Sequence, residues 1–487
     1  MKRRLLAIST LGVLASASLA GSGGAARAGN HAARTPIKHF IVLMQENHSY
    51  DNYFGTYPRG DGIPKGVCMP KDLARRSAGC VKPFALRNDP VQDLGHNKIV
   101  FRSQYNRGQM NGFVSTFDSQ GLNGRLTMGH YDGRDIPFYW NIADQFVLFD
   151  RFFTSAAGGS VWNHMFWVSG TPGNGKLDEV PRAGFGKLPM IFDRLEEAGV
   201  SWKFYVQNYD PRITFRSRVS TDRGSQIVWV PPLDYARYLD NPKLFSHIVD
   251  MSQYYRDLTR GTLPEVAYMA PSGSSEHPPG SIQAGERFVR TIMNALIEGK
   301  YWKSSAFMWS YDDWGGWYDH VRPPKVDRFG YGFRAPALLV SAYARRGYVD
   351  HTTLDFTSYL KFIEQNWNLK PLSSRDARAN SIMGAFDFSS PPRLPAIVAA
   401  ARGIKPPEAP KRSIVYPSYI VAFLLTAILI AAAAFNRRAK PGQPPPPSPP
   451  SGGDALRLEP QRPEPRPSRL GSPEPLTFPS FPPRRKK

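Results

Sequence analysis

The stretch that decides the fold is Phe40-Ile-Val-Leu-Met-Gln-Glu-Asn47, and it has a counterpart in Ala306-Phe-Met-Trp-Ser-Tyr-Asp-Asp313. Each is an apolar run of strand length that ends abruptly in two oxygen donors. If these runs are neighbouring parallel strands, their carboxyl ends bring three carboxylates and one amide together, in the crevice where open α/β sheets bind ligands. Three carboxylates so close would repel one another without a cation between them. The sequence therefore predicts a metal site.

The predicted metal ligands are Glu46, Asn47, Asp312 and Asp313. Their oxygen atoms are hard donors that suit magnesium, calcium or manganese and that zinc or iron also accept. The expected cofactor is one divalent metal ion, whose identity the sequence leaves open. The alternative is that these residues are helix caps or parts of solvated loops, because single surface carboxylates are common. The metal site is favoured because both pairs end apolar runs and are followed by glycine-containing turns.

The composition indicates a folded protein with an uneven basic charge. The chain has 487 residues, of which 13% are aromatic, so an extensive packed core is expected. The net charge is +22, to which residues 1–28 contribute +4 and residues 436–487 contribute +7. The remaining excess is compatible with anionic substrates or phospholipid surfaces. No basic helix or base-stacking motif indicates nucleic acid, so no nucleic-acid partner is expected.

The amino terminus predicts export. Met1-Lys-Arg-Arg precedes a short apolar run, and Ala26-Arg-Ala28 offers a cleavage site between small residues, so residues 1–28 are interpreted as a secretory signal peptide. The choice between the general and the twin-arginine route stays open. In an oxidising compartment the two cysteines of the chain, Cys68 and Cys80, are expected to form a disulfide. Two free thiols in a reducing cytosol are the alternative, and metal binding by the pair is less favoured.

The rest of the chain divides into a catalytic domain and a membrane-associated carboxyl part. Residues 29–400 read as one α/β domain, in which strand-like runs alternate with helix-like stretches. After a linker at 401–413, residues 414–435 form an apolar stretch without a charged residue, long enough to cross a bilayer of about 30 Å. This stretch is predicted to be a transmembrane helix, with a buried core helix as the alternative.

The predicted span implies a topology. Basic residues flank it with a slight excess on the carboxyl side, and a cleaved signal peptide would leave the catalytic domain outside. We therefore expect an anchor in the inner or plasma membrane, with the catalytic domain on the periplasmic or extracellular side. Residues 436–487 are proline-rich and cannot bury a core, which predicts a disordered tail or, alternatively, a ligand for a proline-binding partner.

A third segment, Ser155 to Gly170, places Ser160 after two glycines and before a helix-like apolar stretch. At such a helix start, backbone N–H groups and the helix dipole favour phosphate. A serine hydroxyl next to a metal loses its proton more readily than a free one and can act as a nucleophile. The alternative is that Ser160 is only an N-cap, with Asn163 and His164 as packing residues.

Two of the ten histidines lie in polar loops that suit a catalytic role. His96 follows Asp-Leu-Gly, and His277 lies in Ser-Glu-His-Pro-Pro before a predicted helix. Either histidine can contact a transferring phosphoryl group or protonate a leaving oxygen. His320 and His351 each follow an aspartate and are as readily structural.

Taken in order, these motifs resemble the bacterial phosphoesterase family of nonspecific phospholipases C and related acid phosphatases. The opening motif of that family, Glu-Asn-Arg/His-Ser-Phe/Tyr-Asp-x-x-Phe-Gly, is similar to residues 46–55. The similarity extends over roughly residues 36–370 through five further motifs, at 128–137, 150–153, 276–279, 312–320 and 334–336.

The resemblance implies an alkaline-phosphatase-like α/β sandwich with a central, mostly parallel sheet. It implies a single metal ion bound by the four predicted ligands, and a nucleophile similar to Ser160 in its position before Asn163 and His164. By the same resemblance, His96 and His277 would contact phosphate. We assign His277 to protonating the leaving alcohol, and His96, Asn163 and His164 to binding phosphate.

Two activities fit these expectations. The first is a metal-dependent phosphoric ester hydrolase of the phospholipase C type, which cuts phospholipids on the diacylglycerol side of phosphate through a serine nucleophile. The alternative is a membrane-anchored acid phosphatase of broad specificity. Expected substrates are therefore phospholipids or small phosphate esters. The head group stays open, because the predicted span and tail stand where the large phosphocholine-specific members carry extra domains.

Overall fold

In the computed structural model, the described residues are 32–87, 89–173, 178–217, 225–402, 423–429 and 431–432. The chain divides into two units, Met1–Pro407 and Glu408–Lys487. The predicted signal peptide and tail, and most of the predicted linker and membrane span, lie outside the described residues. Within the described part, no helix is long and apolar enough to cross a membrane. The membrane span therefore stays a prediction.

The first unit is built on an eight-stranded sheet in the order β12-β6-β11-β10-β1-β9-β7-β8. Five of its seven neighbouring pairs are parallel, and β11 runs antiparallel to both of its neighbours. The predicted α/β class with a mostly parallel sheet is confirmed. The strands of this sheet are β1 (His39–Gln45), β6 (Val147–Phe149), β7 (Trp202–Val206), β8 (Ile248–Asp250), β9 (Val266–Ala270), β10 (Ser305–Tyr311), β11 (Ala337–Ser341) and β12 (Tyr348–Asp350).

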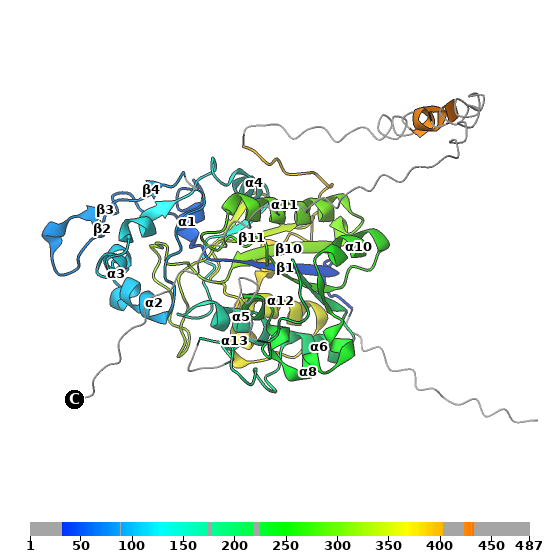
Figure 1. Cartoon of the computed structure of the whole chain (residues 1–487), viewed down its shortest axis with the longest axis horizontal. Coiled ribbons are helices and arrows are strands. Elements are labelled where there is room, and N and C mark those ends of the chain that lie inside the picture. Colours follow the sequence, from blue (N-terminus) through cyan, green and yellow to red (C-terminus); the bar gives the residue numbers. More distant parts are fainter. Residues whose placement is uncertain are drawn as a thin grey trace, which may run out of the picture. The chain divides into compact units, whose positions relative to one another are not determined.

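Helices cover both faces of the sheet (Figure 1). One layer contains α4 (Pro137–Gln145), α10 (Ser252–Arg260) and α11 (Ile282–Glu298). The opposite layer contains α5 (Ser160–Ser169), α6 (Ile191–Ala198), α8 (Ala236–Leu239), α12 (Thr357–Trp367) and α13 (Ser374–Arg378). The remaining α-helices and strands are α1 (Tyr50–Phe54), α2 (Lys98–Tyr105), α3 (Phe113–Asp118), α7 (Gln226–Trp229), α9 (Pro242–Phe245), β2 (Met69–Pro70), β3 (Cys80–Val81), β4 (Phe84–Ala85) and β5 (Gly129–His130).

The longest of these helices, α11, shows how the sequence specifies a layer. Its buried residues Ile282, Val289, Ile292, Met293 and Leu296 recur at helical spacing, so one apolar stripe faces the sheet. The Ser281 side chain caps the helix by accepting a hydrogen bond from a backbone N–H of the first turn. The helix predicted near this position from the sequence is confirmed.

β1 and β10 lie side by side at the centre of the sheet, in parallel register from His39 opposite Ser305 to Gln45 opposite Tyr311. Every residue of β10, and every residue of β1 after the first, is buried. Because both faces of the sheet are covered, both strands read as nearly continuous apolar runs rather than as alternating patterns. The predicted pairing of the two runs is confirmed, and both strands end at the same edge of the sheet.

The segment from α1 to β5 gathers beside the sheet, at the blue and cyan end of the molecule in Figure 1. Cys68 and Cys80 form a disulfide that joins the β2–β3 pair, with their Cα atoms 5.4 Å apart. The predicted disulfide is confirmed.

Candidate functional site

The four predicted ligands meet directly after β1 and β10, and all four are buried. The backbone N–H of Asp312 donates to Gln45 O at 3.0 Å, which holds the two strand ends together. One terminal atom of the Asn47 amide lies 2.9 Å from Glu46 Oε2 and 2.6 Å from Asp312 Oδ1. The other lies 2.9 Å from His96 Nε2 and 3.2 Å from His277 Nε2. The orientation of this amide therefore decides what the cluster can bind.

Two histidines determine the orientation of the Asn47 amide. His96 Nδ1 donates to Leu94 O at 2.7 Å, and His277 Nδ1 donates to Pro278 O at 2.6 Å. A neutral imidazole protonated at Nδ1 presents a lone pair at Nε2, so both Nε2 atoms need a donor. Burial lowers the pKa of His277, which favours this neutral ring. The two N–H bonds of the Asn47 amide satisfy both rings.

With its nitrogen facing the histidines, the Asn47 amide turns its oxygen toward Glu46 and Asp312. Three oxygen atoms then converge without a hydrogen between them, and a cation fits that arrangement. The opposite orientation would let the amide donate to both carboxylates. It would also require a second proton on each of the two histidine rings, because their Nδ1 atoms already face carbonyl oxygens. The residues present therefore fit a divalent metal ion.

His164 is an additional candidate ligand. Its Nε2 lies 3.2 Å from Glu46 Oε1 and 3.8 Å from Asp312 Oδ2, and the three side chains offer ligand atoms that all lie within 4.8 Å of one another. Burial lowers the pKa of His164 to about 3, so the ring is neutral. Asp312 Oδ2 has no hydrogen-bond partner among the described residues. Glu46, His164 and Asp312 form a possible metal site.

From the sequence alone, His164 is predicted to contact phosphate rather than the metal. One signal for the second role was available: His164 follows Ser160 by four residues, and residues four apart share one face of a helix. That periodicity brings both side chains of α5 to the ends of β1 and β10. Burial, followed by repulsion among the neighbouring carboxylates, raises the pKa of Glu46 and of Asp312 well above their ordinary values. A bound cation would offset that repulsion.

Ser160 begins α5, but it does not cap the helix. The N-cap residue is Gly159, and the Ser160 hydroxyl instead donates to Asp313 Oδ2 at 3.3 Å. The other Asp313 oxygen accepts from the backbone N–H of Gly315 at 2.8 Å. Asp313 therefore lies beside Ser160, and the cluster of Glu46, His164 and Asp312 does not include it.

The N-terminus of α5, which the sequence analysis assigned to phosphate, is covered by a carboxylate. Asp178 accepts hydrogen bonds from the backbone N–H groups of Gly159 and Trp162. Asn163 also has a local role: its Oδ1 accepts from Ala156 N at 2.9 Å, and its Nδ2 donates to Gly159 O at 3.1 Å. It shapes the loop before Ser160, and phosphate contact by Asn163 stays a prediction.

A cavity of about 620 Å³ opens at this cluster. Its walls include Glu46, His96, Ser160 and His277, so the structure brings together residues predicted from four separate motifs. The wall also includes Asp178 and α7 with Trp229, which the sequence analysis missed because the segment between 173 and 260 carries no recognisable motif.

Behind the cavity, a buried carboxylate joins three segments of the site. Glu276, next to His277, accepts hydrogen bonds from Tyr53 at 2.5 Å, Tyr139 at 2.5 Å and Tyr311 at 2.8 Å. Tyr311 ends β10 directly before Asp312, so Glu276 links the histidine loop to the metal cluster. Burial raises the pKa of Glu276 to about 8.

Three such buried carboxyl groups predict a stability that falls as the pH rises. Burial raises the pKa of Glu276 to about 8, of Glu286 to about 7 and of Glu364 to about 9, from 4.5. The folded protein therefore holds protons that the unfolded chain releases above about pH 4.5. As the pH rises from the pKa of the unfolded chain to the pKa in the folded protein, each group lowers the free energy of unfolding by at most about 1.4 kcal/mol per pH unit. Urea unfolding at pH 5, 6, 7 and 8 should show this decline, and Glu364→Gln should reduce its slope, whereas the exposed Glu298→Gln should not. A free energy of unfolding that rises over this range would contradict the assignment.

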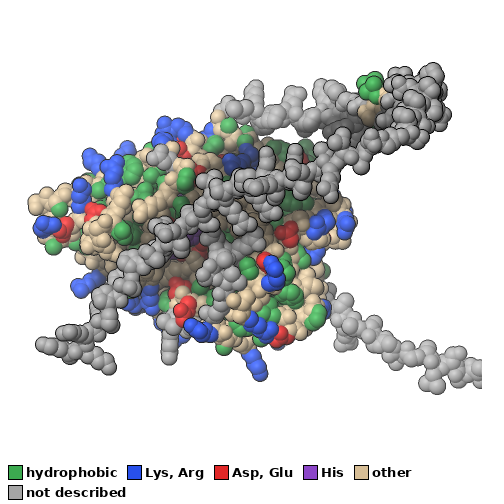
Figure 2. Space-filling model, viewed as in Figure 1, with side chains coloured by type: hydrophobic (Ala, Val, Ile, Leu, Met, Phe, Trp, Pro, Cys, Tyr) green, Lys and Arg blue, Asp and Glu red, His purple; other side chains and the backbone are tan. Residues whose placement is uncertain are grey.

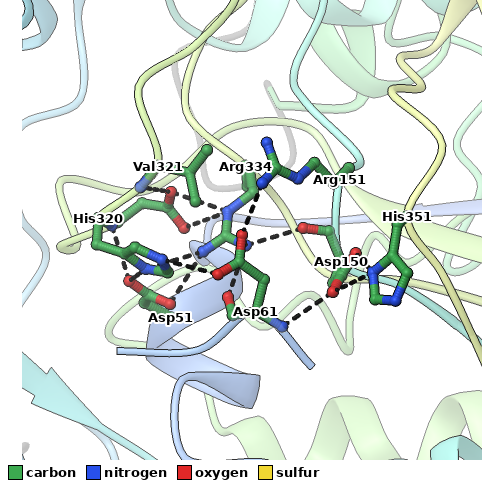
Figure 3. A network of polar contacts seen from close by, with 9 residues as sticks. Asp51, Asp61, Asp150, Arg151, His320, Val321, Arg334 and His351 are labelled. Carbon is green, nitrogen blue, oxygen red and sulfur yellow. Dashed lines mark hydrogen bonds and ion pairs between the residues drawn. The ribbon is translucent and has the colours of Figure 1, made fainter. Parts of the chain in front are cut away.

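A second network ties the two ligand-bearing loops together (Figure 3). The fully buried Arg334 pairs with Asp51 at 3.0 Å and with Asp319 at 3.0 Å. Asp51 lies in α1, shortly after the predicted ligands Glu46 and Asn47. Asp319 follows the predicted ligands Asp312 and Asp313 along the chain. His320 lies in the same network, with Nδ1 2.7 Å from Asp51. Burial alone would lower the pKa of His320, but the hydrogen bond and charge of Asp51 raise it.

Replacing Arg334 with methionine should destabilise the fold strongly. The substitution leaves Asp51 and Asp319 buried without a cation, which costs about 3–5 kcal/mol. Urea unfolding measures this loss. Arg151→Met is the matched control, because Arg151 is partly exposed and pairs with Asp61 at the edge of the same network, a contact worth about 1 kcal/mol or less. Equal losses in both variants would contradict the role of Arg334.

The fold and the site define a class first: an α/β protein with a possible buried metal site at the carboxyl edge of its sheet. The match to known proteins then identifies the family. The Phosphoesterase family model matches residues 37–370, so the chain belongs to the Phosphoesterase family and is a phosphoester hydrolase. This confirms the resemblance inferred from the motifs.

Phospholipases C are among the relatives of the chain. It is 28% identical over 421 residues to phospholipase C B of Mycobacterium tuberculosis, covering 74% of this chain and 79% of that protein. It is 28% identical over 463 residues to a non-hemolytic phospholipase C of Burkholderia pseudomallei, covering 79% and 63%. It is 25% identical over 413 residues to non-specific phospholipase C3 of Arabidopsis thaliana, covering 74% and 76%.

Solved structures show only a distant likeness. A protein of the alkaline phosphatase superfamily from Vibrio parahaemolyticus has a TM-score of 0.32 at 12% identity, covering 67% of this chain and 66% of that one. Ps i-CgsB has a TM-score of 0.38 at 10% identity, covering 72% and 76%. Likeness at this level carries no argument, so the alkaline-phosphatase-like comparison stays a prediction.

Proposed function

We propose that the protein is a metal-dependent hydrolase of the phospholipase C type, with Ser160 as its nucleophile. The observation that carries the proposal is the position of the Ser160 hydroxyl, in the wall of the same cavity as Glu46 and His277 and 3.3 Å from a buried oxygen of Asp313. The phospholipases C of Mycobacterium tuberculosis and Burkholderia pseudomallei support the substrate class.

Glu46, Asn47, His164 and Asp312 would hold the metal ion. Asp313, which the sequence predicts as a further ligand, is assigned here to the Ser160 proton instead, because its Oδ2 accepts a hydrogen bond from the Ser160 hydroxyl at 3.3 Å. When bound, a divalent cation supplies Lewis-acid chemistry, because it withdraws charge from phosphoryl oxygens. The histidines that bind the Asn47 amide keep its oxygen turned toward the carboxylates. The amide oxygen is therefore already oriented before the reaction begins.

In the first half-reaction, the Ser160 oxygen attacks phosphorus and its proton passes to Asp313 Oδ2. Burial raises the pKa of Asp313 well above its ordinary value, which suits it to accept a proton. The bond from phosphorus to the diacylglycerol oxygen breaks. When the anionic substrate binds, His277 takes up a proton at Nε2 and releases the Asn47 amide, which His96 still holds at 2.9 Å, and His277 donates that proton to the diacylglycerol oxygen.

In the second half-reaction, water attacks the phosphorus of the phosphodiester that now joins Ser160 to the head-group alcohol. Neutral His277 takes the proton of the water, and Asp313 returns its proton to the Ser160 oxygen. The products are phosphoalcohol and the starting enzyme, so protons balance over the cycle. His96 lies next to His277, with ring centroids 5.4 Å apart. Leu94 O and the Asn47 amide already engage both of its ring nitrogens, so phosphate contact by His96 stays a prediction.

The full chain should be tested on p-nitrophenyl phosphate, p-nitrophenylphosphorylcholine and phosphatidylcholine vesicles, each with and without a chelator. The proposal predicts metal-dependent release of diacylglycerol from the vesicles. Turnover of the monoester alone would assign the chain to the acid phosphatases. No turnover of any substrate by metal-loaded protein would overturn the catalytic assignment.

The proposal includes export through residues 1–28 and anchoring through residues 414–435, both of which rest on the sequence. Membrane fractionation of expressing cells tests them. We expect the full chain in the membrane pellet after an alkaline wash, and recovery in the supernatant would contradict anchoring.

A further inference from the structure

We propose that a basic surface beside the catalytic cavity docks the enzyme on an anionic phospholipid bilayer. This docking surface consists of Ile99, Arg102, Arg322, Val326 and Arg328. The inference rests on the proposed phospholipase function, and it adds the part of the chain that would meet the lipid.

The docking surface begins at the wall of the cavity. Asn97, which lines the cavity, is the N-cap of α2, and its side chain accepts hydrogen bonds from the backbone N–H groups of Ile99 and Val100. Val100 is buried, whereas Ile99 is 74% exposed. An aliphatic side chain in water two residues from a catalytic cavity gains by burial in another apolar phase.

Among the described residues, the three arginines of the docking surface have no carboxylate partner. Arg102 lies one turn after Ile99 on the exposed side of α2. Arg322 donates to the Tyr105 hydroxyl at 3.1 Å, and Arg328 lies 4.7 Å from the centroid of the Phe329 ring. Within the described part of the chain, none of the three forms an ion pair. Figure 2 shows Lys and Arg side chains around the end of the molecule where α2 lies.

Ring contacts join α2 to the loop that carries Arg322, Val326 and Arg328. The Tyr105 hydroxyl binds Arg322, and Phe101 packs against Phe333 with ring centroids 4.5 Å apart. The Trp162 ring makes a second connection between the two segments. Lys98 Nζ lies 4.7 Å from its centroid, and the centroid of the Phe329 ring lies 6.0 Å from it. The two segments therefore form one surface.

Val326 places a second aliphatic group on this surface, with 42% of its area exposed. The neighbouring Asp327 does not neutralise the arginines, because it pairs with Arg375 at 2.6 Å. Cations and aliphatic side chains together fit the headgroup boundary of an anionic membrane, where the charges meet lipid phosphates and the aliphatic groups enter the acyl region. Single exposed apolar residues are common on soluble proteins. Here the two aliphatic side chains lie on one surface with three arginines that form no ion pair with any described residue.

Two full-chain variants test the docking surface. Arg102→Gln/Arg328→Gln removes charge, and Ile99→Ser/Val326→Ser removes apolar area. The matched control is Arg256→Gln/Arg260→Gln, which removes two exposed arginines from α10. Each protein is assayed on phosphatidylcholine vesicles with and without 30% phosphatidylserine, and on soluble p-nitrophenylphosphorylcholine.

We expect the charge variant to raise the apparent KM for anionic vesicles roughly 10- to 30-fold, at about fivefold per cation, and to remove the preference for phosphatidylserine. The apolar variant should slow hydrolysis of both kinds of vesicle. Neither variant should change kcat/KM for the soluble ester. Unchanged vesicle kinetics with full soluble activity would overturn the docking surface and leave the proposed function standing.

Cosedimentation of the Ser160→Ala protein with phosphatidylserine vesicles keeps the test independent of turnover. The charge substitutions should lower the bound fraction in this background, and an unchanged fraction would overturn the proposal. If the charge substitutions weaken binding to duplex DNA but leave binding to vesicles unchanged, the proposal is overturned in favour of a different polyanion. Vesicle binding that depends on the surface, with no hydrolysis of any ester, would uphold the docking surface and reject the proposed function.

Discussion

Asp312→Asn should abolish metal-dependent hydrolysis while it stabilises the metal-free protein. The carboxylate is fully buried, with Oδ1 2.6 Å from the Asn47 amide and Oδ2 3.8 Å from His164 Nε2. The neutral side chain has the same shape but cannot supply the charge that a cation requires. We expect metal affinity to fall by about a hundredfold or more, and activity at limiting metal to fall with it.

The stability effect of Asp312→Asn separates a lost ligand from a damaged fold. Without a cation, burial and the charge of Asp313 work against ionised Asp312, so the substitution should raise the free energy of unfolding of chelated protein by about 1–4 kcal/mol. Added metal should then stabilise the wild type much more than the variant. Urea unfolding with chelator and with metal measures both effects, and Asp240→Asn, an exposed partner of Arg216, is the control. A variant that keeps full activity and its stabilisation by metal would exclude Asp312 as a ligand.

Ser160→Ala should lower kcat about 10³- to 10⁴-fold without loss of metal or of fold. The hydroxyl is neither the N-cap of α5 nor a member of the cluster of Glu46, His164 and Asp312. Its removal should therefore change the free energy of unfolding by about 0.5 kcal/mol or less. Competitive inhibition by inorganic phosphate should persist, because the remaining residues of the cavity wall are unchanged.

The control for Ser160→Ala is Ser225→Ala, since Ser225 lines the same cavity at a different place. We expect this control to change kcat less than tenfold. Rapid quench of the wild type with substrate labelled in the head group should also trap the phosphoalcohol group on Ser160. An alanine variant with near-normal kcat would exclude the covalent route and leave direct attack by water.

The centre of the fold was accessible from the sequence because β1 and β10 are buried on both faces. Such strands need apolar residues at every position, and each run ends where polar ligands begin. Two strand-length runs with the same ending therefore predicted both the pairing and the meeting of Glu46, Asn47, Asp312 and Asp313. The disulfide was also predictable, because the sequence predicts export to an oxidising compartment and two cysteines allow one intramolecular pairing.

The outer strands and the cavity wall left weaker signals. β6 and β12 have three residues each, too few for a periodic pattern, and the antiparallel direction of β11 depends on the path of its connections. The place of His164 depends on the direction in which α5 leaves the sheet. Asp178 and Trp229 reach the cavity from segments without a motif, so only long-range packing brings them there.

The central claim is that the cluster at the ends of β1 and β10 holds one divalent metal ion on which hydrolysis depends. Its most direct test is to strip the full chain with a chelator, return metal in steps and follow p-nitrophenylphosphorylcholine hydrolysis beside bound metal. The account predicts no activity in the stripped protein and a linear return that ends at one equivalent of metal per chain. Full activity in protein shown to be metal-free would contradict it.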